Sequence, residues 1–155
     1  MNKKLKYLYD QDIADRYSNL PVVDQNKRDE TRIQGVTDIL KNGKSFCAQD
    51  YHHAALIFQH GDKLEHFQKA HELAMKAVQM GDSSAKWLAA ASLDRSLLMA
   101  GKPQKYGTQF GYTEPDGWKI AEPIDPTVTD EERAEWNVPP LKDALKTYKE
   151  KYNLS

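Results

Sequence analysis

Apolar residues recur every three or four positions along most of the chain, which is the spacing of one face of an α-helix. The first such run covers residues 3–18 and stops before Pro21, because proline disfavours a helical conformation in the residue before it. The second run covers residues 25–41, with Asp24 as its N-cap, and Arg32 lies on its apolar stripe. The N-terminal part of the chain therefore predicts two helices.

Three further helices follow in close succession, at about residues 49–59, 63–80 and 83–100, with short glycine-containing loops between them. Short loops place neighbouring helices antiparallel to one another. The segment 71–99, with closely spaced alanines and a glycine between its helices, resembles tetratricopeptide and Sel1-like helical hairpins. The resemblance implies local stacking of helices rather than a long solenoid.

The segment 103–126 contains prolines and glycines that prevent any long regular element, and its interleaved aromatic residues favour an ordered loop or a short strand pair. Thr129 opens a capping box that predicts a short helix to Trp136, and a last helix runs from about residue 140 to 152. We therefore expect a single all-α domain over residues 1–155, a compact array of six to seven helices with an irregular loop at 103–126.

The 22 basic residues nearly balance the 23 acidic ones, so no overall field favours nucleic acid or an anionic membrane as a partner. No apolar stretch approaches the roughly 20 residues needed to span a bilayer, and no secretory leader is recognisable. The single Cys47 excludes an internal disulfide. We expect a cytoplasmic protein without nucleic-acid or membrane partners.

Two charged residues interrupt the most apolar helix, at about 83–100. At helical spacing Asp94 lies with Trp87 and Leu98, while Arg95 lies with Leu88, so neither faces bulk water. A buried ion costs several kcal/mol unless it is paired and hydrogen-bonded. The two residues either form a buried tie that fixes helix register or line a cavity that binds a ligand.

The helix at 49–59 carries polar residues on two adjacent faces, His52 with Gln59 and His53 with His60. His60 precedes Gly61, which should end the helix there, and the negative end of the helix dipole favours a protonated imidazole. His60 is therefore a candidate general acid or base near neutral pH. The alternative is a histidine that only binds the last carbonyls of the helix.

Metal binding is disfavoured, because no His-Glu-x-x-His motif occurs and the helical histidines and their partners lie two turns apart. The glycine-containing loop after residue 100 is not followed by the Lys-Ser or Lys-Thr of a phosphate-binding loop. No Gly-x-Ser-x-Gly nucleophile motif is present. We expect neither a metal nor a cofactor, and no covalent catalysis.

Two further groups of polar residues complete the candidate site. Asp12 and Arg16 are one helical turn apart and can pair, either as an exposed salt bridge or as part of a pocket. The loop after residue 100 is either an ordered connection or a source of amide and hydroxyl groups for a polar ligand, supplied by Gln104, Tyr106, Thr108 and Gln109.

Four uncommon motifs occur in order along the chain: LYDQDIADR at 8–16, YHHAALIFQHG at 51–61, ASLDR at 91–95 and GKPQKYGTQ at 101–109. Together they resemble the motifs of a bacterial family catalogued as a domain of unknown function, over about residues 8–140. The resemblance implies no particular activity. It does imply that the polar residues of these motifs belong to one shared design.

The leading hypothesis is a metal-independent general acid–base enzyme, a hydrolase, lyase or isomerase that acts on a small polar or peptide-like substrate. His60 would transfer the proton with His53 as its substitute, and Asp94 would orient the imidazole. Arg95 would hold an anionic group. The residues expected to contact the substrate are Arg95, Gln59, His52, Gln104, Tyr106, Thr108, Gln109, Asp12 and Arg16.

Two other readings compete with this one. The chain could be a non-catalytic helical-repeat-like module that binds a peptide or protein partner. It could also be a structural protein whose buried charges only specify packing. The enzyme hypothesis requires that His60, Asp94 and Gln109 lie around one pocket.

Overall fold

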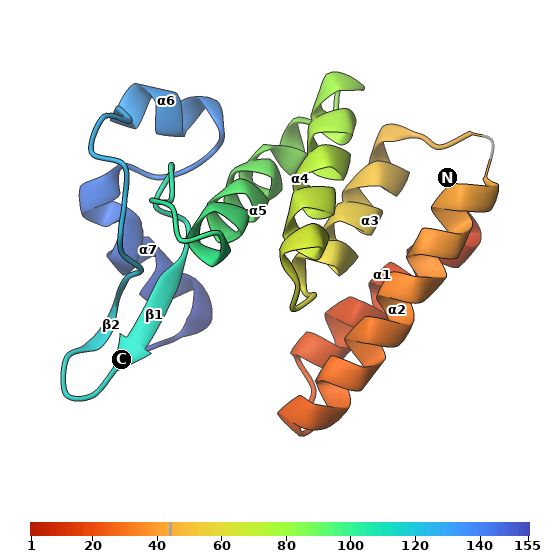
Figure 1. The fold of residues 1–155 in the computed structure, drawn as a ribbon, viewed down its shortest axis with the longest axis horizontal. Coiled ribbons are helices and arrows are strands. Elements are labelled where there is room, and N and C mark those ends of the chain that lie inside the picture. The colour runs from red at the N-terminus through yellow and green to blue at the C-terminus, as the bar shows by residue number, and fades with distance from the viewer. Residues whose placement is uncertain (44) are drawn as a thin grey trace.

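The computed structural model describes residues 1–43 and 45–155, which form seven α-helices, one short 3₁₀ helix and one β-hairpin (Figure 1). The expected all-α array of six to seven helices is confirmed. In chain order the elements are α1 (Lys3–Arg16), α2 (Val22–Asn42), α3 (Ala48–Gln59), α4 (Leu64–Gln79), η1 (Ser83–Ala85), α5 (Lys86–Met99), β1 (Phe110–Thr113), β2 (Gly117–Ile120), α6 (Asp130–Glu135) and α7 (Leu141–Tyr152).

The helices are arranged as a row rather than around one centre. The α1–α2 pair packs on α3, α3 packs on α4 and α4 on α5, while the β-hairpin, α6 and α7 lie beyond α5 (Figure 1). Neighbours in the α3–α4–α5 stack run antiparallel because the connections between them are only a few residues long. This row leaves the end of α3 within reach of both α1 and α5.

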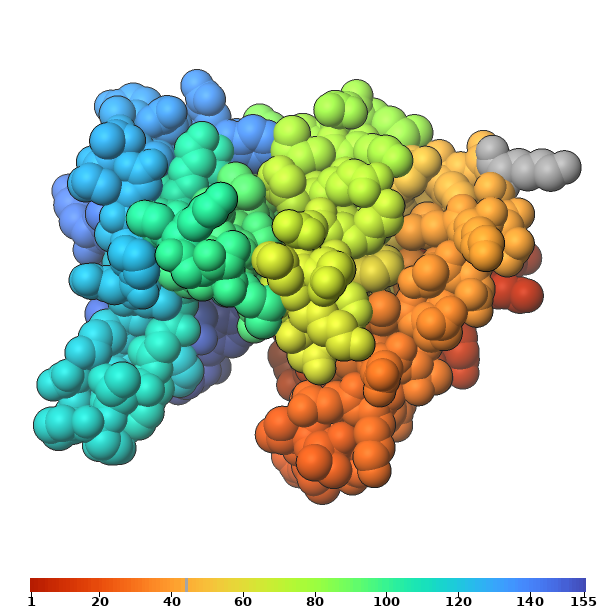
Figure 2. Space-filling model, in the orientation of Figure 1, coloured from red at the N-terminus to blue at the C-terminus, as the bar shows by residue number. Residues whose placement is uncertain are grey.

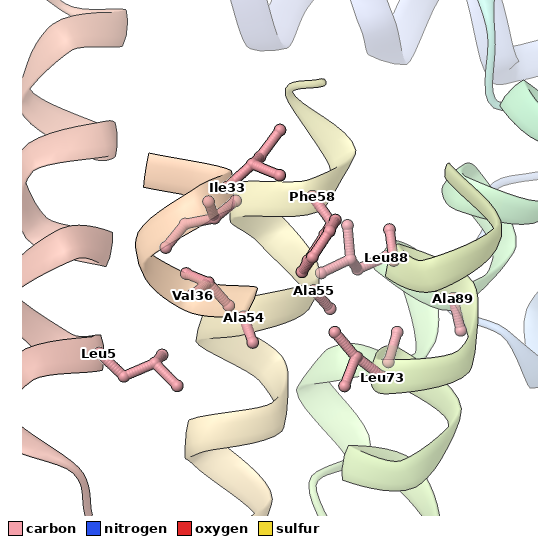
Figure 3. Packing of buried hydrophobic residues seen from close by; sticks show 12 residues of the cluster. Leu5, Ile33, Val36, Ala54, Ala55, Phe58, Leu73, Leu88 and Ala89 are labelled. Atoms are coloured by element: carbon pink, nitrogen blue, oxygen red, sulfur yellow. The ribbon is translucent and has the colours of Figure 1, made fainter. Parts of the chain in front are cut away.

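The main core lies on both sides of α3. Figure 3 shows Leu5 of α1 and Val36 of α2 on one side of Ala54, with Leu73 of α4 on the other. Small residues such as Ala54 and Ala55, both fully buried, let the neighbouring helices approach α3 closely. A second, smaller cluster lies beyond α5 and contains Ala90, Tyr106, Val128 and Val138.

The structure shifts two of the predicted helix starts. Asp24 does not cap α2, because the helix begins at Val22 with Pro21 at the N-cap, where the missing proline N–H costs no hydrogen bond. The predicted helix at 83–100 begins with the 3₁₀ turn η1, whose N-cap Asp82 accepts a hydrogen bond from the Ser84 N–H, and only then continues as α5.

The remaining local predictions agree with the structure. The expected strand pair is the antiparallel hairpin β1–β2, in which Phe110 pairs with Ile120. Thr129 forms the predicted capping box of α6 with Glu132. Among the described residues, no helix has the combined length and apolarity that a membrane crossing requires.

Candidate active site

A buried carboxylate of α1 holds the imidazole at the end of α3. His60 Nδ1 lies 2.7 Å from Asp12 Oδ2. Asp12 is fully buried, whereas 23% of the His60 side chain is exposed. Because the carboxylate accepts the hydrogen bond, Nδ1 carries the proton and Nε2 is the free nitrogen of the neutral ring. The pair is thus an Asp–His dyad with one accessible basic nitrogen.

The end of α3 presents this imidazole because the helix stops there. His60 is the C-cap of α3: its backbone N–H donates to the carbonyl of Ile57, and the N–H of Gly61 donates to the carbonyl of Phe58. The predicted helix end beside Gly61 is therefore correct. The His60 side chain does not bind the last carbonyls of the helix, because its Nδ1 bonds to Asp12.

Positive charge keeps the buried Asp12 ionised. Burial alone would raise the pKa of Asp12, but the hydrogen bond and charge of His60, together with the charge of Arg16, outweigh burial and lower that pKa. Arg16 Nη2 lies 3.1 Å from Asp12 Oδ1, which confirms the pairing expected from their spacing. Arg32 Nε lies 3.4 Å from the same oxygen. The dyad thus carries a true carboxylate at neutral pH.

Asp12 belongs to a larger layer of ion pairs between α1 and α2. Arg32 at its centre contacts Asp15 at 2.6 Å and Asp29 at 2.6 Å. The layer consists of three carboxylates and three guanidiniums, from Asp12, Asp15, Asp29, Arg16, Arg28 and Arg32. Four of these residues, Asp15, Asp29, Arg28 and Arg32, were not predicted to belong to the site. Only Arg32 stands out in the sequence, because it lies on an apolar stripe.

Arg95 reaches the same end of α3 from the other side. Its Nη1 donates a 2.7 Å hydrogen bond to the backbone oxygen of Gln59, the residue before His60. Its guanidinium carbon lies 5.0 Å from the centre of the Phe67 ring. Burial lowers the pKa of Arg95, and the charge of Arg16 lowers it further. The structure thus places Arg95 near both the dyad and Arg16.

Asp94 does not orient an imidazole, which corrects the prediction made for it. Its Oδ1 accepts hydrogen bonds from the backbone N–H groups of Lys105 at 2.7 Å and Tyr106 at 2.9 Å. Its Oδ2 accepts from the N–H of Thr108 at 3.0 Å and the hydroxyl of Thr108 at 2.7 Å. With four donors on two oxygens, the carboxylate is fully used in fixing the loop after α5.

The polar side chains of that loop form hydrogen bonds or pack within the protein itself, so their predicted contact with a ligand gains no support from the structure. Gln104 is fully buried, and its amide bonds to the backbone of Gln109 and Ala121. Gln109 Nε2 bonds to the Ala91 carbonyl and the Thr108 hydroxyl. Tyr106 packs in the second core cluster. His60, Asp94 and Gln109 therefore do not form the shared pocket that the enzyme hypothesis required, so an acid–base site has to be built on His60 without the other two. The loop is an ordered connection.

His53 and His52 lie away from the dyad. His53 is two turns before His60, about 10 Å along the helix axis, so it cannot replace His60 at the same atom. It is buried and stacks on Tyr9 with ring centres 4.0 Å apart, and burial lowers its pKa. Within the described residues its Nδ1 has no hydrogen-bond partner. Both histidines line a separate polar surface pocket.

His52 forms a second Asp–His contact, with Nδ1 2.8 Å from Asp82 Oδ2. Ser84 Oγ lies 3.4 Å from the same Nδ1 and donates to Asp82 Oδ1 at 2.5 Å. In a Ser-His-Asp triad the serine and the carboxylate engage opposite ring nitrogens. Here both engage one nitrogen, so this group does not activate the serine.

The lower edge of the molecule is hollowed between the two ends of the row of helices. Figure 2 shows a notch in the lower edge of the molecule between the β-hairpin and the paired ends of α1 and α2, and Figure 1 shows the α3–α4 connection and the end of α5 above it. Gln59, buried next to the dyad, has a side-chain Oε1 that accepts no hydrogen bond from the described residues. This oxygen is closed off from solvent, so a ligand does not reach it in this arrangement.

Comparison of the chain with family models, with curated proteins and with solved structures finds no match. The resemblance to the bacterial family and to helical-repeat hairpins stays a prediction. The site must therefore be interpreted from its own geometry. Groups of three or more His, Cys, Asp or Glu residues with the arrangement of a metal site do not occur in the described part of the chain.

Proposed function

We propose that the protein is a general acid–base enzyme in which the Asp12–His60 dyad transfers a proton to or from a small polar or peptide-like substrate. The observation that carries this proposal is the 2.7 Å contact between a fully buried, ionised carboxylate and a partly exposed imidazole. A carboxylate on Nδ1 fixes the tautomer and orientation of the ring and stabilises the imidazolium that forms during proton transfer.

His60 is the catalytic residue in this scheme, because its Nε2 is the atom that meets the substrate. As a base, Nε2 takes a proton from a substrate C–H, N–H or O–H group, or from water, and the imidazolium later returns it to the leaving atom. Asp12 is a positioning residue that acts through His60. Proton transfer of this kind supports a hydrolase, lyase or isomerase. We also propose that the protein acts in the cytoplasm.

The test compares two histidines that occupy similar surroundings on α3. His60 and His52 each contact an aspartate through Nδ1 and are 23% and 24% exposed. Wild type, His60→Gln and His52→Gln are assayed with a panel of peptides, esters, hydroxy acids and amino acids for hydrolysis, elimination and exchange of C–H protons with deuterated water. We expect turnover by the wild type, a loss of about 10²–10⁴-fold in His60→Gln, and near-normal rates in His52→Gln.

Turnover that survives in His60→Gln would overturn the proposal. The non-catalytic binding module would be favoured if panel compounds raised the melting temperature of wild type and His60→Gln equally and neither protein converted them. Loss of turnover in both variants would point to general damage to α3 instead of a role for one imidazole.

A further inference from the structure

The charge of Arg95 is not neutralised by the protein. Among residues 1–43 and 45–155, no carboxylate forms a salt bridge with it, and its one hydrogen bond goes to the neutral carbonyl of Gln59. The guanidinium is half-buried, and its surroundings lower its pKa. Half-buried cations are costly when no anion compensates them. An anion from outside the described residues would supply the negative charge that the protein does not.

The neighbouring ion pairs cannot supply that negative charge. In the α1–α2 layer, the carboxylates of Asp12, Asp15 and Asp29 are matched in number by the guanidiniums of Arg16, Arg28 and Arg32. Arg95 adds one positive charge to this neutral group, and protonation of His60 would add another. Arg95 is thus left without a matching carboxylate in this group, and an anion would balance it.

Part of the Arg95 guanidinium is free to bind a ligand. The Phe67 ring lies 5.0 Å from the guanidinium carbon, and Gln59 takes Nη1. The buried side-chain nitrogens and oxygens without partners, within the described part of the chain, belong to Arg16, Arg32, His53 and Gln59. Since the other nitrogens of Arg95 are neither bonded nor in that group, they reach solvent. Two free N–H groups on a planar fork match the two oxygens of a carboxylate or phosphate.

We infer that Arg95, assisted by the nearby charge of Arg16, binds an oxyanion group of the substrate, a carboxylate or a phosphate, next to His60. This inference rests on the proposed function, since it names the chemical class of the substrate of that same site. It extends the function because it fixes one end of the substrate at Arg95. The reacting atom would then lie between this anchor and His60 Nε2.

The experiment measures anion binding without any reaction. The purified protein, residues 1–155, is titrated with inorganic phosphate and, separately, with acetate, at constant ionic strength set by sodium chloride. Binding is followed by melting temperature and by calorimetry. For a chain of this size, an anion at one hundred times its Kd raises the melting temperature by about 5–10 °C. The larger response, to phosphate or to acetate, identifies which oxyanion the site prefers.

The decisive variant is Arg95→Met, which keeps the apolar stem against Phe67 and removes the charge. We expect it to melt at or above the wild-type temperature without anion, because the uncompensated charge is gone, and to lose the anion response. Arg95→Lys should retain charge but bind about tenfold more weakly, since it lacks the fork. The matched control Lys76→Gln, on a half-exposed lysine paired with Glu72 in the last turn of α4 and outside the α1–α2 layer, should respond like wild type.

Failure of this inference and failure of the proposed function look different. Anion stabilisation that persists in Arg95→Met, or is absent in the wild type for both anions, would overturn the oxyanion site while leaving the dyad intact. A strong loss of stability in anion-free Arg95→Met would show that Arg95 is a packing tie and would also overturn it. If His60→Gln keeps its turnover while Arg95→Met loses the anion response, the acid–base function fails and the anion site stands.

Discussion

Replacing Asp94 by asparagine tests whether this carboxylate fixes the loop after α5. Asp94 Oδ1 and Oδ2 each accept two hydrogen bonds, and the residue is fully buried. An asparagine of nearly the same shape keeps one oxygen and presents an NH₂ group to the other two donors. The Thr108 hydroxyl can rotate to accept from that amide, whereas the Thr108 backbone N–H cannot and loses its acceptor.

The expected cost follows from these bonds. Hydrogen bonds to a charged group contribute about 1.5–3 kcal/mol each, so two lost bonds correspond to about 3–6 kcal/mol. Because the Thr108 hydroxyl recovers part of this, we expect Asp94→Asn to lower the free energy of unfolding by about 3 kcal/mol. The melting temperature of a chain of this size should then fall by about 6–12 °C.

Urea unfolding followed by tryptophan fluorescence measures this loss. The control is Asp10→Asn, because Asp10 is exposed and pairs with Lys6 at 2.6 Å on the surface. Surface pairs contribute roughly 0–1 kcal/mol, so the control should change stability little. A loss below about 1 kcal/mol in Asp94→Asn would refute the structural account and return Asp94 to the list of candidate site residues.

The pH dependence of stability gives two further predictions. The pKa of Asp12 in the folded protein lies below its usual 3.8, so the stability that Asp12 provides is complete above pH 3.8 and is lost as the pH falls through the lower folded value. This contribution is absent in Asp12→Asn, and urea titrations of both proteins at acidic pH should reveal the difference. The folded pKa of His53 lies below its usual 6.5, so the unfolded chain binds more protons and stability declines as the pH falls below 6.5. His53→Leu should flatten this second slope, and a slope unchanged in the variant would contradict the burial argument.

Local structure was largely predictable because its signals are local. Helical periodicity located the stacked helices, and the capping box at Thr129 predicted α6. The errors at Asp24 and at residues 83–85 concern helix starts, where proline and 3₁₀ geometry compete with the usual caps. Sequence also indicated correctly that Asp94 is buried and that Asp12 pairs with Arg16.

The partners of these buried groups were not predictable, because they depend on which helices meet. His60 and Asp12 are 48 positions apart, and nothing in either segment alone indicates that α1 delivers a carboxylate to the end of α3. The same ambiguity misassigned Asp94: a buried carboxylate next to a polar loop fits a ligand site and a loop anchor equally well on sequence. The four donors that meet it in the fold decide for the anchor.

The origin of the dyad in two separate helices has a consequence for how the molecule can be divided. The imidazole and the Arg95 anchor belong to the stack from α3 to α5, but the carboxylate enters from α1, whose Leu5 is part of the core against α3. A fragment that begins after α1 would keep His60 and Arg95 yet leave the ring without an orienting group. Helix α1 is thus part of the proton-transfer site itself. No contiguous half of the chain contains Asp12, His60 and Arg95 together.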